Sequence, residues 1–149
     1  ARKKLSEPEV IIRADHEFSD TRGSIDYYVM PEGVNWVGVI KSKKGTVRAN
    51  HYHPKQQQRC LIISGSCACV YKPLKGKDRE LRHHLAVAGD IVITEPNVAH
   101  AVVYLEDTVF LNLVSGERDP TNYGKHTIPC EIVKKEEVHK YMEMYGKGK

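Results

Sequence analysis

The chain has 149 residues, of which 40% are hydrophobic and 28% charged, and its formal net charge is +4. This length suits one domain with its own core, and no apolar run approaches the roughly 20 residues of a membrane-spanning helix. The lysines are scattered over turns and chain ends, without a helix-turn-helix, zinc-finger or RNP-like pattern. We therefore expect a single domain over residues 1–149 that binds neither nucleic acid nor membrane.

The predicted elements are short segments rich in Val, Ile, Thr and Tyr, separated by clusters of Gly, Pro, Asp or Lys. This pattern is typical of an antiparallel sandwich or barrel, so we predict an all-β fold. The expected strands lie near residues 9–13, 24–30, 35–41, 46–52, 58–64, 66–72, 79–87, 90–94, 99–104, 107–114 and 127–133.

Only the C-terminal segment, residues 134–145, has the spacing of a helix. Val138, Tyr141, Met142 and Tyr145 stand at positions i, i+3, i+4 and i+7, which places them on one helix face. We expect this face to pack against the sheet or against a neighbouring subunit.

The four cysteines are expected to be reduced. Cys60, Cys67 and Cys69 lie in apolar strand-like segments, Cys130 stands alone, and none of the spacings is that of a CxxC motif. The polar residues 2–8 also lack the apolar region of a signal peptide. Both observations favour a cytoplasmic protein.

The most informative motif contains two histidines, His51 and His53, in a strand-like segment. Residues i and i+2 of a strand point to the same face, so the two imidazoles should project side by side. Such a pair can bind a metal ion or act as acid and base near neutral pH.

Two longer blocks resemble the two motifs of the cupin superfamily. The first reads G-x5-H-x-H-x4-Q-x6-G from Gly45 to Gly65, and the second runs from Gly89 to Tyr104. The usual cupin motifs have Glu at the position of Gln58 and Gly at that of Asn97, and Asn readily adopts the left-handed conformation that such a turn needs. The resemblance implies a cupin double-stranded β-helix, or jelly roll, with a short C-terminal helix.

In metal-binding cupins, the positions that match His51, His53, Gln58 and His100 converge on one ion. Because Gln58 is a neutral ligand, two alternatives stay open. The three histidines could hold Zn²⁺ or Fe²⁺, or they could act as bare acid–base groups that require no cofactor.

A second resemblance is to cupins that act on nucleotide-linked deoxysugars. The D-x-R-G turn with Arg22, the K-G-x-[LV]-R-x-x-H-Y block at 44–52 and the P-x-x-x-A-H segment at 96–100 resemble dTDP-4-dehydrorhamnose 3,5-epimerase. The combined form R-x-N-H-Y-H-x4-Q is also similar to ketoisomerases acting on dTDP-4-keto-6-deoxyglucose and to the cupin domain of capsular-sugar reductases.

This second resemblance implies an epimerase or ketoisomerase acting on a nucleotide-linked 4-keto-6-deoxysugar. The residue matching His51 removes a proton beside the ketone, and His53 could return it. Arg22 and Arg48 would hold the nucleotide or the developing enolate. Tyr104 is the candidate acid, and Gln58 and Tyr123 are further candidates for substrate contact.

Two alternative functions stay open, a metal-dependent cupin oxygenase or isomerase and a non-catalytic sugar-binding cupin. The resemblance also implies a homodimer, in which residues 9–30 cross to the partner and Arg22 lies near the nucleotide of the adjacent subunit. Arg48 and His51 differ by three positions and would face opposite sides of a regular strand, so we predict a bulge near Ala49 and Asn50.

Overall fold

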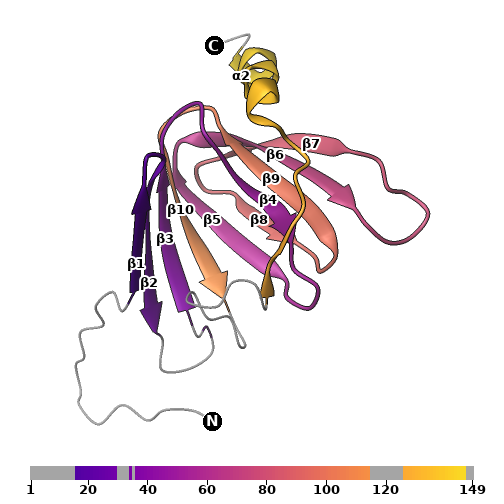
Figure 1. Ribbon diagram of the computed structural model, residues 1–149. Coiled ribbons are helices and arrows are strands. Elements are labelled where there is room, and N and C mark those ends of the chain that lie inside the picture. The colour runs from indigo at the N-terminus through magenta and orange to yellow at the C-terminus, as the bar shows by residue number, and fades with distance from the viewer. Residues whose placement is uncertain (1–15, 30–33, 35, 115–125, 147–149) are drawn as a thin grey trace.

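The computed structural model describes residues 16–29, 34, 36–114 and 126–146. Two antiparallel sheets pack face to face as a jelly roll, with one short helix at the C-terminal end (Figure 1). The six-stranded sheet has the order β1 (His16–Asp20), β2 (Gly23–Val29), β3 (Trp36–Ser42), β10 (Thr108–Val114), β5 (Gln58–Ser64) and β8 (Ile91–Thr94). The five-stranded sheet has the order β11 (Ile128–Pro129), β4 (Val47–Tyr52), β9 (Val98–Tyr104), β6 (Ser66–Pro73) and β7 (Arg82–Val87). The prediction of an all-β jelly roll is confirmed.

The core between the sheets is built from inward-facing residues of both. Phe110, Ile40 and Ile62 of the six-stranded sheet pack there with Tyr104 of the five-stranded sheet and with the buried cysteines. All four cysteines are free, as predicted. The buried cysteines therefore act as packing residues, and none of the four forms a disulfide bond.

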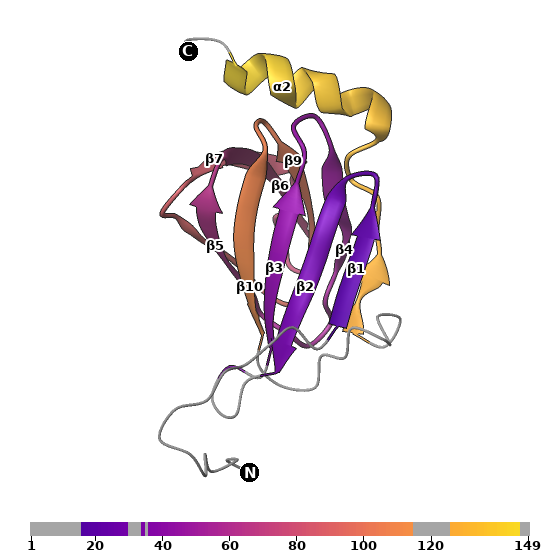
Figure 2. The same ribbon diagram turned by 90° about the vertical axis from the view of Figure 1, so that its left-hand side faces the viewer.

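The C-terminal segment covers the outer face of the five-stranded sheet. A 3-10 turn η1 (Lys135–Glu137) leads into α2 (Val138–Gly146). Val138 and Tyr141 are buried against Ala68, Val70 and Val103, so the predicted helix face does pack on the sheet. Figure 2 shows α2 lying across the ends of the strands. None of the helices in the described ranges combines the length and the apolar character needed to cross a membrane.

The structure adds one strand and shortens another. The expected strand 9–13 lies outside the described residues, and β1 at His16–Asp20 was not among the expected strands. The expected strand 127–133 is wrong beyond residue 129, because the backbone N–H groups of Ile132 and Val133 donate to the side chain of Asn50 and not to a strand.

Two turns depend on left-handed backbone. Asn97 has φ 62°, which confirms it as the residue that replaces the glycine of the second motif. Gly65, between β5 and β6, has φ 89°, and a Cβ there would collide with Thr108 Oγ1 and the carbonyl oxygen of Asp107. Both motif positions are therefore explained by the left-handed backbone conformation that their turns require.

Candidate histidine centre

A bulge in β4 sets the direction of the first histidine. Ala49 and Asn50 have φ values of 72° and 55°, and the register with β9 shifts there, so that Ala49 pairs with Ala101 and His51 with His100. The predicted bulge is confirmed. Because it adds one residue, Arg48 and His51 can both turn inward.

The bulge is held by the side chain of Asn50. Its Nδ2 donates to the carbonyl oxygen of Val133 (2.9 Å), and its Oδ1 accepts from the N–H groups of Ile132 (2.9 Å) and Val133 (3.0 Å). The N–H of Cys130 donates to the Asn50 carbonyl oxygen at 2.8 Å. The C-terminal segment therefore fixes the strand immediately before His51.

Three imidazoles meet at the end of β4. Their ring centroids are separated by 4.8 Å (His51 to His53), 4.7 Å (His51 to His100) and 5.3 Å (His53 to His100). One ligand nitrogen from each lies within 4.8 Å of the others, and no further group of three such ligands occurs within the described ranges. His53 and His100 are buried, while His51 is half-buried. We call these three residues, with Gln58, the histidine cluster.

Backbone carbonyl groups lie against two of the rings and set the tautomer of one, His100. His100 Nδ1 lies 3.0 Å from the carbonyl oxygen of Val98, and His53 Nδ1 lies 3.1 Å from that of His126. A carbonyl oxygen can only accept, so His100 Nδ1 carries the proton, and in the neutral ring the lone pair is on Nε2, as in histidines that bind metal ions. His53 differs, because its Nδ1 also lies 3.3 Å from the Thr127 hydroxyl and its Nε2 lies 2.9 Å from Gln58 Oε1.

Gln58, at the start of β5, joins the cluster from the other sheet. Its side-chain amide lies 2.9 Å from His53 Nε2 and 3.3 Å from Cys60 Sγ. The amide oxygen Oε1 faces His53 and accepts from Nε2, while the amide nitrogen donates to Cys60 Sγ. Gln58 therefore brings its oxygen into the histidine cluster.

Arg48 and Tyr104 lie elsewhere. Arg48 is 8% exposed, and its Nε donates to Ser42 Oγ (2.7 Å) and its Nη2 to the Lys41 carbonyl oxygen (3.3 Å). Burial lowers the pKa of Arg48. Tyr104 is fully buried and stacks on Phe110, and burial raises its pKa. Its use as a general acid stays a prediction.

Arg22 joins Arg48 at the end where β4 begins. Its Nε donates to Asp20 at 3.0 Å, and its Nη1 lies 3.5 Å from the carbonyl oxygen of Val47. The hydrogen bond from Arg22 lowers the pKa of Asp20 from the usual 3.8 to about 2. We call Asp20, Arg22, Ser42 and Arg48 the arginine cluster. Tyr123 lies outside the described residues.

The structure thus divides the predicted site between two places. About 13 Å of strand separates Val47 from His51, given the rise per residue of a strand. The sequence predicted a bulge near Asn50 but not that the Asn50 side chain would bind the C-terminal segment. The contacts of the Val98 and His126 carbonyl groups were also missed, because carbonyl groups leave no signal in the side-chain pattern.

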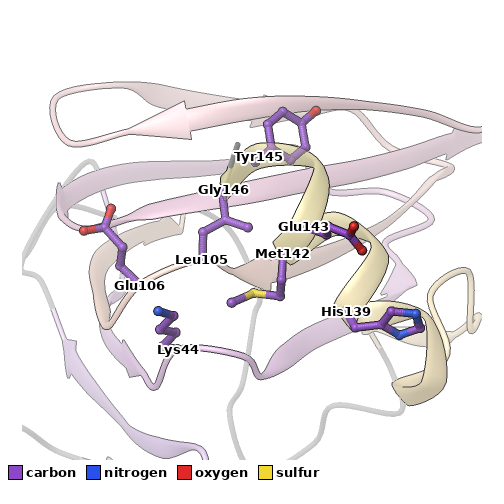
Figure 3. A pocket seen from close by; sticks show the side chains of 8 residues that line it. All are labelled: Lys44, Leu105, Glu106, His139, Met142, Glu143, Tyr145 and Gly146. Carbon is purple, nitrogen blue, oxygen red and sulfur yellow. The ribbon is translucent and has the colours of Figure 1, made fainter. Parts of the chain in front are cut away.

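A groove lies beneath α2, with a volume of roughly 620 Å³. Lys44, Glu106 and Glu143 line it together with Leu105 and Met142 (Figure 3). It contains no member of either cluster, so it is separate from the histidine centre.

No family model and no curated protein sequence matches the chain. Solved structures do match. The capsular polysaccharide assembling protein CapF from Staphylococcus aureus is 22% identical, with a TM-score of 0.67 over 83% of this chain and 34% of CapF. Oxalate decarboxylase from Lactobacillus farciminis is 17% identical, with a TM-score of 0.65 over 85% of this chain and 38% of the enzyme. The chain has the cupin fold.

A domain of Drosophila melanogaster CENP-C is also similar, at 13% identity and a TM-score of 0.54, over 67% of this chain and 72% of that domain. The chain spans about a third of the length of CapF and of the oxalate decarboxylase. At these identities the likeness concerns the fold alone, so function has to be argued from the site.

Proposed function

We propose that this chain is a metal-dependent cupin enzyme of the isomerase type, with one divalent ion held by His51, His53 and His100. The observation that carries the proposal is the meeting of three imidazoles whose ligand nitrogens lie within 4.8 Å of one another. The hydrogen bond from His100 Nδ1 to the Val98 carbonyl oxygen supports it, because it leaves the lone pair of the neutral ring on Nε2.

The donor set fits such an ion. Metal–nitrogen bonds of about 2.0–2.1 Å place ligand nitrogens roughly 3.3 Å apart in a tetrahedral site, so small ring rotations would close the cluster. The Gln58 amide oxygen is near enough to His53 to be a fourth, neutral ligand. Imidazole donors suit Zn²⁺ or Fe²⁺. When bound, the ion would polarise a substrate carbonyl oxygen and stabilise the enolate formed beside it.

A second candidate function uses the same histidines without a metal ion. In it, His51 removes a proton beside the ketone of a nucleotide-linked 4-keto-6-deoxysugar, and His53 supports the transfer. The sequence motifs favour it, and so does the likeness to CapF, a protein named for capsular polysaccharide assembly. His51 is also the least buried of the three histidines, as a base that meets a substrate must be.

One experiment separates the two functions. The protein is stripped with a chelator, reloaded with Zn²⁺, Fe²⁺ or Mn²⁺, and assayed for deuterium exchange from solvent into a panel of nucleotide-linked 4-keto sugars. Stoichiometric metal binding with exchange only in the loaded protein supports the metal-dependent isomerase. Exchange that survives chelation and is lost in His51→Asn supports the metal-free base.

His139→Ala, at an exposed histidine of α2, is the matched control and should behave as wild type. A protein that binds no metal ion and catalyses no exchange would contradict both functions. The remaining function would then be that of a non-catalytic sugar-binding cupin. Equilibrium binding of the same sugars would test it.

A further inference from the structure

The inner face of the five-stranded sheet continues past the histidine cluster to the edge strand β7. By strand register, His51 of β4 lies beside His100 of β9, His100 beside Tyr71 of β6, and Tyr71 beside Arg82 of β7. Directly paired residues of neighbouring strands point to the same face. Tyr71 and Arg82 therefore continue the row that begins with the two histidines.

The packing of β6 shows independently that Tyr71 points inward. Cys67 and Cys69 pack in the core between the sheets, whereas Ala68 and Val70 pack with residues of α2 on the outer face. Side chains alternate along a strand, so Tyr71 shares the inner face with the two cysteines. Its ring therefore lies on the same face as the histidine cluster.

The same alternation separates the two histidines of β7. His83 lies on the outer face, where its ring meets Tyr141 and Tyr145 of α2. His84 lies on the inner face, and its ring centroid is 5.3 Å from that of Tyr71, with the ring planes tilted by 41°. We call Tyr71 and His84 the aromatic pair.

The aromatic pair is accessible to a ligand. Tyr71 is half-buried and His84 is exposed, although both are on the face that forms the core further along the strands. Among the residues that the structure describes, neither the Tyr71 hydroxyl nor the His84 ring nitrogens have a hydrogen-bond partner. Aromatic surface with a few available polar groups is typical of small-molecule sites.

The charges at this end of the sheet favour an uncharged ligand group. Arg82 is next in the row, but its guanidinium already donates to Asp78 at 2.6 Å and to Glu80 at 3.3 Å. Lys72 follows Tyr71 and so points to the outer face, and Glu95, after β8 of the other sheet, adds a carboxylate. The other cations of the β6–β7 connection are exposed and lie beyond the row: Lys75, Lys77 and Arg79. The row itself therefore offers aromatic surface without an unpaired cation for a phosphate.

We propose that the aromatic pair binds the sugar ring of the substrate, with the ring packed on Tyr71 and a sugar hydroxyl hydrogen-bonded to His84. Neighbouring strands are about 4.8 Å apart, so a keto carbon at the histidine cluster would leave the rest of a six-membered ring over Tyr71. Aromatic faces pack against the C–H groups of a sugar, and imidazole nitrogens bind its hydroxyls. The inference rests on the proposed function in either form, because both place a carbonyl group at the histidines.

Equilibrium binding of two probes tests the aromatic pair. The probes are dTDP-glucose and dTDP, which share the nucleotide and differ by the sugar, and neither has a ketone that could react. Tyr71→Ala should raise the dissociation constant of dTDP-glucose at least about tenfold and leave that of dTDP unchanged, because only the sugar loses an aromatic contact. Tyr71→Phe keeps the ring and should bind both probes as wild type does.

His84→Ala is the second variant, and it keeps the test valid if Tyr71→Ala fails to fold, because His84 is exposed. It should weaken dTDP-glucose about threefold to tenfold, as loss of one hydrogen bond does, and again spare dTDP. The matched control is His83→Ala, on the outer face of the same strand, which should bind both probes as wild type does.

Titration of the same variants with Zn²⁺ separates this inference from the proposed metal site, and their Zn²⁺ affinity should be unchanged. A wild type that binds no Zn²⁺ would contradict the metal site, whereas the sugar probes alone decide the aromatic pair. Wild type that binds dTDP-glucose no more tightly than dTDP would overturn the inference. So would unchanged dTDP-glucose binding in both Tyr71→Ala and His84→Ala, or an equal loss of both probes, which would assign the pair to the nucleotide.

Discussion

The histidine cluster and the arginine cluster lie at the two ends of β4 and use their polar groups in opposite ways. In the histidine cluster, Nδ1 of His53 and His100 is bound by the backbone, and the rings turn toward one another. In the arginine cluster, the guanidinium groups donate to Ser42, to Asp20 and to carbonyl groups of the chain itself. The first arrangement prepares nitrogen atoms for a ligand, whereas the second holds loops and strands together.

The contrast teaches that residue type and motif position do not by themselves assign a side chain to a site. Arg48 and His51 belong to one sequence block and both turn inward, yet the partners of Arg48 are already within the protein. The roles of Arg22 and Arg48 in substrate binding stay predictions. The variants below test whether the two clusters differ in function as they differ in hydrogen bonding.

The largest effect is expected at the histidine cluster. His100→Ala removes one of three nitrogen ligands, so it should lower the affinity for Zn²⁺ by more than about 100-fold. Loss of a group that only hydrogen-bonds to a metal ligand typically costs about 10–100-fold, and loss of the ligand itself should cost more. Isothermal titration calorimetry on chelator-stripped protein measures this, with His139→Ala as control. An unchanged affinity in His100→Ala would show that the ion, if bound, uses other ligands.

At the arginine cluster, Arg48→Met should reduce stability and leave metal affinity unchanged. The variant keeps much of the buried volume but removes the donors to Ser42 and Lys41, at a cost of about 1–3 kcal/mol in the free energy of unfolding. Urea denaturation measures it. If stability stayed the same and nucleotide-sugar affinity fell, Arg48 would be a ligand-binding residue and the contrast would fail.

The bulge between the clusters should respond in the opposite direction. Ala49 has φ 72°, a conformation that costs an alanine about 1–2 kcal/mol and a glycine little. Ala49→Gly should therefore gain up to about 1 kcal/mol of stability, after the greater entropy of glycine in the unfolded chain is subtracted. Thermal unfolding checks this. A destabilised Ala49→Gly would mean that the methyl group contributes more through packing than it costs through strain.

The smallest effect belongs to the exposed ion pair of the arginine cluster. Asp20→Asn should cost less than about 1 kcal/mol, because solvent screens the pair. The pKa of Asp20 is lowered to about 2, so its contribution is present above the usual 3.8 and is lost as the pH falls toward 2. Stability curves of wild type and Asp20→Asn should therefore converge between pH 4 and pH 2. Curves that stay parallel would show that the pair contributes nothing.

Much of the fold follows from local pattern. Segments rich in Val, Ile, Thr and Tyr between turn residues predicted β3, β4, β6, β9 and β10 near their observed bounds, because β-branched and aromatic residues favour strands and the turn residues end them. The bulge at Ala49 and Asn50 followed from the parity of Arg48 and His51, and the turn at Asn97 from the conformational freedom of asparagine. The helix of residues 138–146 followed from its i, i+3, i+4 spacing.

What only the tertiary structure decided is which of these residues meet. His51 and His53 are neighbours in the chain, so their pairing could be predicted, and His100 was added through a motif. The carbonyl groups that orient the rings come from Val98 and from His126, 73 residues after His53. Strand order and register set these contacts, and register carried Arg48 to one end of β4 and the histidines to the other. The sequence by itself determined the side chains and local conformations, while their orientation depends on backbone groups that are chemically the same at nearly every position and acquire a role only through folding.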